Sequence, residues 1–391
     1  MAGIETDKAA QAVIDAIAEK YKNLKTLNII VAGKTGVGKS TLINAVFKEK
    51  LANTGVGKPV TTHMQKFYKE DIPLSIYDTR GFELRKEVQD EVKQEVLNTI
   101  NDGFAKKDIN EVIHCIWYCI NTASNRIEPE EIEWLRELSM EDKVAQVPII
   151  VILTQAFSQK NAQEMRHLLL EENLNVIEVI PVLAEDYVIE GVGTAAAYGL
   201  DVLIKVMVDI LPDELQDTLQ NVQIASLEEK KRRASEIVAK YAAATLAEGA
   251  IPIPLSDSVM MTGTQIFMIA RITVVFGFDL TKGTIMGLLV VTLGPSAASY
   301  LGKNVFSYLL KLIPGVGTVV GGLMSGGTAA IITAALGEAY VGLLSLVFKG
   351  EMSINDLKTK KGKDAMANLF KDQLTLKSQE YSKRIGIAKE E

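Results

Sequence analysis

Residues 33–41 read Gly-Lys-Thr-Gly-Val-Gly-Lys-Ser-Thr and have the spacing of a Walker A phosphate-binding loop. The stretch follows an apolar run, Leu27–Ala32, and precedes a helix-like segment, residues 42–50. Glycines let the backbone approach a polyphosphate closely, and the N–H groups at the start of the following helix point at the same anion. A glycine-rich turn that only joins a strand to a helix is the alternative. The expected phosphate-binding residues are Gly33, Thr35, Gly36, Val37, Gly38, Lys39, Ser40 and Thr41.

Two side chains of this loop and a second motif predict a metal-assisted site. Lys39 adds a positive charge between the outer phosphates, and Ser40 supplies a hydroxyl suited to Mg²⁺. A second predicted strand, residues 74–77, delivers Asp78 at its carboxyl end, where ligands gather in a parallel sheet. We expect Asp78 to hold the water shell of Mg²⁺ opposite Ser40, and the backbone N–H of Gly81 to approach the terminal phosphate. An ordinary turn that begins at an aspartate is the alternative here.

Strands alternate with helices from residue 25 to residue 212, which predicts an α/β domain with a doubly wound, mainly parallel sheet. Residues 1–24 are expected to form an amphipathic helix that packs on this domain, and residues 213–248 a long helical connector. Within the domain, residues 55–62 combine glycines, a proline and hydroxyls and suit a mobile loop. Residues 63–68 are expected to form an edge strand.

Composition limits the classes of function. The chain has 391 residues, 48% of them hydrophobic, and a net charge of −7, so it can bury a core and has no basic excess for a nucleic-acid partner. The N-terminal stretch lacks an uninterrupted apolar core and does not read as a secretion signal. Cytoplasmic residence is the expectation that follows.

The C-terminal half differs sharply from the rest in charge. Residues 249–348 are expected to form an all-α, apolar, glycine-rich domain, and residues 349–391 a charged amphipathic helical tail. Two charge-free stretches, residues 283–302 and 312–337, are long enough to associate with a membrane, since a bilayer span takes about 20 apolar residues. Tight packing in a soluble helical bundle is the alternative. The charged side chains of residues 249–348 are Asp257, Arg271, Asp279, Lys282, Lys303, Lys311 and Glu338.

The motifs resemble, in their order along the chain, those of small GTP-binding domains. Pro59-Val60-Thr61-Thr62 is most similar to the Era and septin-like branch, which includes immunity-related GTPases. Together with the apolar C-terminal region, the chain resembles bacterial GTPases whose C-terminal domain has no assigned function. The resemblance implies GTP or GDP and Mg²⁺ as ligands. It also implies pairing across the nucleotide face, so we expect a homodimer that forms with the triphosphate.

The resemblance also implies roles for individual residues. Thr61 or Thr62 would cap the metal in the triphosphate state, and loss of the terminal phosphate would release residues 53–62 and 79–85. The implied metal ligands are Ser40, Thr61, Thr62 and Asp78. The implied catalytic residues are Lys39, Thr61, Thr62, Arg80 and Gly81. The implied contacts to the rest of the nucleotide come from Thr154, Gln155 and Ala184.

Two departures from the family pattern weaken these inferences. The base-reading motif of the family has a lysine and an aspartate where this chain has Gln155 and Phe157. Guanine specificity is therefore undecided by the sequence: Gln155 can stack, Glu185 is an alternative acid, and adenine nucleotides remain an alternative.

The second departure concerns hydrolysis. Phe82 stands where Ras-like enzymes keep a water-positioning glutamine, so intrinsic hydrolysis should be at or below roughly 10⁻³ to 10⁻⁴ s⁻¹. Arg80, Glu83 and Arg126 are the candidates for a group that replaces the glutamine.

The sequence therefore predicts a GTP-binding switch with slow hydrolysis, in which the nucleotide controls self-association and the exposure of an apolar helical domain to membrane lipid or a partner. A nucleotide-binding structural scaffold with vestigial hydrolysis is the alternative.

Overall fold

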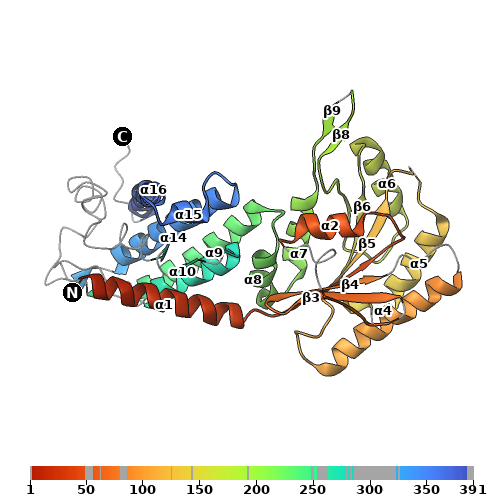
Figure 1. Ribbon diagram of the computed structural model, residues 1–391, viewed down its shortest axis with the longest axis horizontal. Coiled ribbons are helices and arrows are strands. Elements are labelled where there is room, and N and C mark those ends of the chain that lie inside the picture. Colours follow the sequence, from red (N-terminus) through yellow and green to blue (C-terminus); the bar gives the residue numbers. More distant parts are fainter. Residues whose placement is uncertain are drawn as a thin grey trace. The chain divides into compact units, whose positions relative to one another are not determined.

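The structure is a computed structural model, which describes residues 2–48, 56–61, 63–79, 86–124, 126–141, 144–191, 193–247, 251–252, 263–278, 280–281, 284–285, 323–324 and 326–384. The chain divides into two compact units (Figure 1). We call Leu24–Glu229 the sheet unit, and Met1–Asn23 together with Lys230–Glu391 the helical unit.

A seven-stranded sheet forms the centre of the sheet unit, in the order β2-β3-β4-β1-β5-β6-β7. Strands β4, β1, β5, β6 and β7 run parallel, while β2 and β3 are antiparallel additions at one edge. The strands are β1 (Leu27–Ala32), β2 (Val56–Pro59), β3 (Met64–Lys69), β4 (Ile72–Thr79), β5 (Cys115–Asn121), β6 (Ile149–Thr154) and β7 (Glu178–Pro181).

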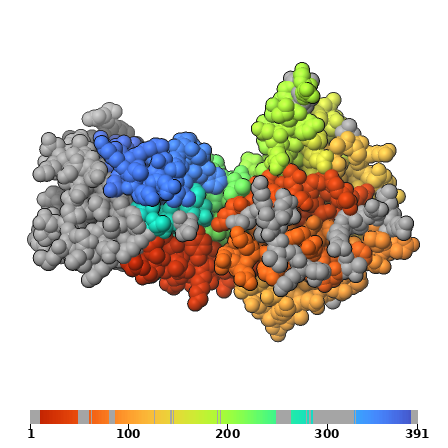
Figure 2. Space-filling model, in the orientation of Figure 1, coloured from red at the N-terminus to blue at the C-terminus, as the bar shows by residue number. Residues whose placement is uncertain are grey.

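Helices cover both faces of this sheet. The helices of the sheet unit are α2 (Lys39–Val46), α4 (Lys86–Lys106), α5 (Pro129–Met140), α6 (Gln159–Glu171), α7 (Leu200–Ile210) and α8 (Asp213–Val222), with a short 3₁₀ turn η1 (Val144–Gln146). A two-stranded hairpin, β8 (Tyr187–Ile189) and β9 (Gly193–Ala195), lies outside the main sheet. It projects from the surface of the sheet unit (Figure 2).

Strand β1 shows why two helical layers form. Successive side chains of a strand point to opposite faces of the sheet. Leu27, Ile29 and Val31 belong to a core shared with α2, α7 and α8, whereas Ile30 and Ala32 belong to a core shared with α4, α5 and α6. Every residue of β1 is buried, as expected for a central parallel strand. The predicted doubly wound, mainly parallel sheet is confirmed.

Two local predictions in this unit were wrong. Strand β3 pairs on both sides, with β2 and with β4, so it is not an edge strand. The edge is β2, within the segment that we expected to be a mobile loop. Its residues Val56–Pro59 pair antiparallel with residues 65–68 of β3. Glycine and proline are tolerated at a sheet edge.

The predicted helical connector is also interrupted. Helix α8 ends at Val222, and α9 (Leu227–Ala247) begins after a turn. The buried amide of Gln223 explains the break, because its Nε2 donates to the Ser226 carbonyl at 2.8 Å and its Oε1 accepts from the Ser226 N–H at 2.9 Å. The side chain thus replaces the helical backbone hydrogen bonds at this point.

The helical unit consists mainly of helices in its described part. They are α1 (Ala2–Lys22), the greater part of α9, α10 (Gly263–Phe276), α14 (Gly326–Phe348), α15 (Ile354–Leu357) and α16 (Lys360–Arg384), with a short strand pair, β10 (Ile251–Pro252) and β11 (Leu323–Met324). Helix α1 packs on α10, and Tyr21 donates to the Phe278 carbonyl at 3.4 Å. Our expectation that the N-terminal helix packs on the sheet domain was therefore wrong.

Close helix packing explains some of the small residues of this unit. A Cβ at Gly337 of α14 would lie 2.5 Å from Cγ2 of Val238 in α9, so the absence of a side chain lets the two helices approach. Helix α14 includes one stretch, Ala329–Phe348, long and apolar enough to cross a membrane, with a mean hydropathy of 1.9. Of this stretch, 61% is buried within the protein, and the core helix of a soluble protein meets the same criteria. The predicted apolar segment at residues 283–302 and the first part of residues 312–337 lie almost entirely outside the described residues.

Candidate functional site

The predicted phosphate loop connects β1 to α2 at the carboxyl end of the parallel strands. Gly33, Gly36 and Gly38 have φ angles of +140°, +78° and +96°, which side chains rarely adopt. Gly38 is the N-cap of α2, so the N-terminal end of this helix follows the loop directly. A Cβ at Gly33 would lie 2.4 Å from the carbonyl oxygen of Cys119 in β5. The backbone therefore has the glycine-dependent path that a phosphate cradle needs.

Lys39, the first residue of α2, is buried, with 7% of its surface exposed. Its ammonium donates to the carbonyl oxygens of Gly33 at 2.9 Å and Lys34 at 3.2 Å. The same nitrogen lies 4.0 Å from Oδ1 of Asp78. The positive charge is thus held at the mouth of the loop, between the backbone and a carboxylate.

Asp78 lies near the end of β4, where it is paired in register with Val31 of β1. Its Oδ1 is buried and accepts no hydrogen bond from any described residue. Burial raises the pKa of the Asp78 carboxyl from 3.8 to about 6, although the charge of Lys39 lowers it in part. A buried carboxylate oxygen without a donor fits a hydrated cation, because the cation offsets the cost of burial and its waters donate hydrogen bonds. Asp78, with the exposed hydroxyl of Ser40 on α2, therefore fits Mg²⁺.

The raised pKa of Asp78 predicts a pH dependence of metal binding. The carboxyl is protonated below its pKa, and proton and Mg²⁺ compete for it. Apparent Mg²⁺ affinity should thus fall by about tenfold for each pH unit below about 6, and titration of Asp78 should add no pH dependence well above that value. Titration of Mg²⁺ into the GDP-containing protein measures this. Asp78→Asn is the control, because nucleotide phosphates titrate equally with both proteins. Parallel pH profiles for the two proteins would contradict the assignment.

One ion pair of the phosphate loop was not predicted. The ammonium of Lys34 lies 2.8 Å from Oε2 of Glu131, a residue of α5 that is buried to 6% exposure. The pair connects the loop to the helix that follows β5. No local sequence pattern predicts this ion pair, because its two residues lie far apart in the sequence and each resembles an ordinary surface charge.

Thr61 follows β2 and contacts α4. Its hydroxyl donates to Oε2 of Glu95 in α4, and the same oxygen accepts the backbone N–H of His63 at 3.1 Å. The His63 ring lies between two carboxylates, with Nδ1 3.2 Å from Glu95 and Nε2 3.7 Å from Glu91. Glu95 therefore fixes the segment that carries the predicted metal-capping threonine.

Thr62, Arg80, Gly81, Phe82 and Glu83 lie outside the described residues.

Arg126, a further candidate for the catalytic group, has a side chain that is 78% exposed and lies 3.5 Å from Glu128. The structure does not bring it to the phosphate loop through any described contact.

Thr154 and Gln155, at the end of β6, contact the phosphate loop directly. The Thr154 hydroxyl donates to the backbone carbonyl of Val37, and Gln155 Nε2 donates to the Gly36 carbonyl at 3.0 Å. Gln155 has a φ of +53°, and Thr122 donates to its carbonyl at 2.9 Å. The two residues predicted to contact the nucleotide thus connect the end of β6 to the phosphate loop by hydrogen bonds.

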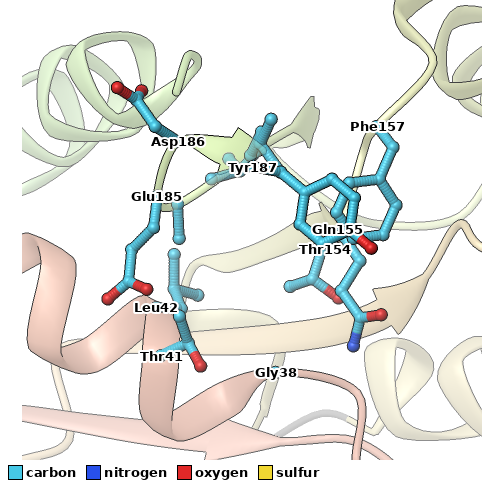
Figure 3. A pocket seen from close by; sticks show the side chains of 12 residues that line it. Gly38, Thr41, Leu42, Thr154, Gln155, Phe157, Glu185, Asp186 and Tyr187 are labelled. Carbon is cyan, nitrogen blue, oxygen red and sulfur yellow. The ribbon is translucent and has the colours of Figure 1, made fainter. Parts of the chain in front are cut away.

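Beyond Gln155 lies a pocket of about 200 Å³ (Figure 3). Its lining residues are Gly38, Thr41, Leu42, Thr154, Gln155, Phe157, Val182, Leu183, Ala184, Glu185, Asp186 and Tyr187. The Phe157 ring turns toward Tyr187 of the β8–β9 hairpin, with ring centroids 4.5 Å apart. The pocket is smaller than a typical small-ligand site, and it continues from the phosphate loop, because Gly38, Thr41 and Leu42 belong to its lining.

Comparisons with known proteins agree with this geometry. Residues 28–155 match the family described as 50S ribosome-binding GTPase, and residues 214–374 match the domain of unknown function DUF697. The chain is 26% identical to neuronal-specific septin-3 of Bos taurus over 209 residues, which cover 46% of this chain and 57% of the septin. It is 28% identical to septin-9 of Rattus norvegicus over 166 residues, which cover 35% of this chain and 29% of that septin. The chain thus spans little more than half of one septin and less than a third of the other.

Among solved structures, a probable GTP-binding protein engB is 24% identical, with a TM-score of 0.30. The match covers 47% of this chain and 97% of the other.

Proposed function

Because the chain joins a septin-related P-loop GTPase domain to a DUF697 domain, we propose that it is a GTP-binding switch that hydrolyses GTP slowly with Mg²⁺. One observation carries the proposal: the ammonium of Lys39 lies 4.0 Å from Oδ1 of Asp78, a buried oxygen without a hydrogen-bond donor among the described residues, beside a glycine loop and the start of α2. Measurement of Mg²⁺-dependent GTP hydrolysis by the full chain tests it. A protein that binds no GDP or GTP at micromolar concentration would overturn it.

The roles of the individual residues follow from their places. The backbone from Gly33 to Thr41 holds the phosphates. The ammonium of Lys39 gives up its hydrogen bonds to the carbonyls of Gly33 and Lys34 and contacts the phosphates instead. Ser40 and Asp78 hold Mg²⁺, which neutralises phosphate charge when bound. Thr154 and Gln155 hold the phosphate loop by hydrogen bonds to its backbone carbonyls. Ala184 lines the pocket that takes the base. Thr61 or Thr62, with Gly81 and Arg80, would respond to the terminal phosphate.

The switch part of the proposal draws support from Thr61. Its hydroxyl is engaged by Glu95 on α4, so a Thr61 that contacts the metal must first give up this hydrogen bond. Two arrangements of one side chain, each with its own partner, are what a two-state element needs. We assign the Thr61–Glu95 hydrogen bond to the state without the triphosphate.

Weakening this contact should shift the equilibrium toward the triphosphate state. Glu95→Gln exchanges charge-assisted hydrogen bonds for neutral ones, a loss of about 1 kcal/mol. We expect affinity for a non-hydrolysable GTP analogue to rise about fivefold relative to GDP. Competition binding with the two nucleotides measures the ratio.

Glu91→Gln is the matched control for this variant. The Glu91 side chain is 63% exposed and lies 3.7 Å from His63, so its loss should leave the ratio unchanged. An unchanged ratio in Glu95→Gln as well would mean that Thr61 plays no part in the switch.

Slow hydrolysis and self-association complete the proposal. Phe82 supplies no hydrogen bond for a water molecule, which supports a low intrinsic rate. The similarity to septins supports pairing across the nucleotide face, and the apolar helix α14 supports exposure of the helical unit to lipid or a partner. Size-exclusion chromatography with GDP and with the GTP analogue tests self-association. Identical elution with both would leave the scaffold alternative, in which hydrolysis is vestigial.

A further inference from the structure

We propose that the Glu185 carboxylate is the group that selects guanine in the pocket beyond Gln155. This inference rests on the proposed nucleotide-binding function and deepens it, because it names the base and the residue that reads it. The usual carboxylate of this fold is absent, since Phe157 occupies its place.

The side chain of Phe157 shows that position 157 does not read the base edge by hydrogen bonding. Its ring packs against the Tyr187 ring at 4.5 Å with an interplanar angle of 51°. The two rings form an apolar wall at one side of the pocket (Figure 3). An aromatic wall favours any purine by stacking and does not distinguish guanine from adenine. Selection of the base therefore needs another polar group.

Two carboxylates line the pocket, and the structure distinguishes them. Asp186 is engaged, because its Oδ1 accepts the backbone N–H of Ala197 at 2.7 Å. In Figure 3 its side chain extends away from the pocket, whereas that of Glu185 extends along it toward Leu42 and Thr41. No described residue forms a hydrogen bond or an ion pair with the Glu185 carboxylate. Glu185 is thus the lining carboxylate that is available to a ligand.

The loop that carries Glu185 is held in place from both sides. Leu183 and Tyr198 exchange backbone hydrogen bonds of 3.1 and 3.0 Å. The Tyr198 hydroxyl donates to the carbonyl of Ala156 at 2.9 Å, which joins this loop to the β6 loop. Glu185 and Gln155 are therefore presented to the pocket by one connected frame rather than by independent loops.

The chemistry of a carboxylate matches guanine. Its two oxygens accept hydrogen bonds and donate none. Guanine presents two adjacent donors, N1–H and the N2 amino group, on its Watson–Crick edge, whereas adenine presents an acceptor at N1. Xanthine has a carbonyl oxygen in place of the amino group and would meet the carboxylate with an acceptor. Glu185 therefore should favour guanine over both adenine and xanthine.

Exchange of Glu185 for glutamine distinguishes recognition of the base from a purely structural role of this side chain. The amide keeps the length of the side chain but offers one donor and one acceptor, which suits xanthine. With Mg²⁺ and the full chain, we expect Glu185→Gln to bind GDP about 10- to 100-fold more weakly than the wild type. XDP should bind more tightly to the variant than to the wild type. Calorimetric titration with GDP, XDP, ADP and 2′-deoxy-GDP measures all four affinities.

Glu190→Gln is the matched control, because it removes the same charge from an exposed position in the turn of the β8–β9 hairpin, which follows Glu185. It should leave the ratio of GDP to XDP affinity unchanged. An unchanged ratio in Glu185→Gln would overturn the inference, as would equal binding of GDP and ADP by the wild type. A change that appears with GDP but not with 2′-deoxy-GDP would place Glu185 at the ribose and also overturn it. Failure of the wild type to bind any of the four nucleotides would instead overturn the proposed function.

Discussion

Lys39→Ala should weaken the binding of GDP and GTP about 30- to 4,000-fold, because truncation of a buried charged partner costs about 2–5 kcal/mol. The ammonium lies at the mouth of the phosphate loop and is 7% exposed, so water replaces it poorly. Its removal also takes away the charge that lowers the pKa of Asp78, and that pKa should rise above 6. Equilibrium titration with a fluorescent guanine nucleotide measures the affinities.

A surface lysine provides the control for this change. Lys205 lies exposed on α7, and Lys205→Ala alters the net charge equally. Its affinity should match that of the wild type. If Lys39→Ala binds nucleotides normally, the loop is not a phosphate site. If it fails to bind but supports assembly and cellular function as the wild type does, nucleotide binding is real and the switch role is wrong.

The parts of the site that the sequence predicted are those built from neighbouring residues. The glycine spacing of residues 33–41 prescribes left-handed backbone and the start of a helix within nine positions, so local chemistry is enough. Asp78 was predictable because a strand ends there, and carboxyl ends of parallel strands share one edge of a sheet. The expected roles of Thr154 and Gln155 came from the resemblance to GTP-binding domains.

The contacts that the sequence did not predict join residues distant in the chain. Lys34 with Glu131, and Thr61 with Glu95, pair only after the sheet has brought their helices together. Each of these residues alone is indistinguishable from a solvated charge or hydroxyl. The packing of α1 on α10 has the same origin, because an amphipathic face predicts burial but does not choose the partner.

The β8–β9 hairpin was missed for a different reason. Its strands are three residues each, too short for an alternating pattern to stand out. Tyr187 therefore looked like a loop residue, although it lines the pocket beyond Gln155 together with Phe157. In the sequence, Phe157 is only a departure from the family's base-reading motif. In the structure it is also a packing residue for an additional hairpin.

Gly33→Ala should destabilise the protein far more than the same change at the other glycines of the loop. At a φ of +140° an alanine is strained by about 1–3 kcal/mol, and its Cβ would lie 2.4 Å from the Cys119 carbonyl oxygen. That oxygen belongs to the backbone of a central strand, so it cannot move aside as a flexible side chain would. With overpacking of a further 1–3 kcal/mol, the expected loss is about 2–6 kcal/mol in the free energy of unfolding. Denaturant unfolding monitored by tryptophan fluorescence measures it.

Gly36→Ala separates backbone strain from steric overlap. Gly36 also has a positive φ, +78°, but a Cβ there would meet nothing within 4 Å. Its cost should be only that of the left-handed conformation, about 1–2 kcal/mol. Equal destabilisation by the two variants would mean that the approach of the loop to β5 does not constrain position 33. A larger loss at Gly33 would show that β5, and not only the nucleotide, fixes the path of the phosphate loop. The cradle would then be formed before any ligand arrives.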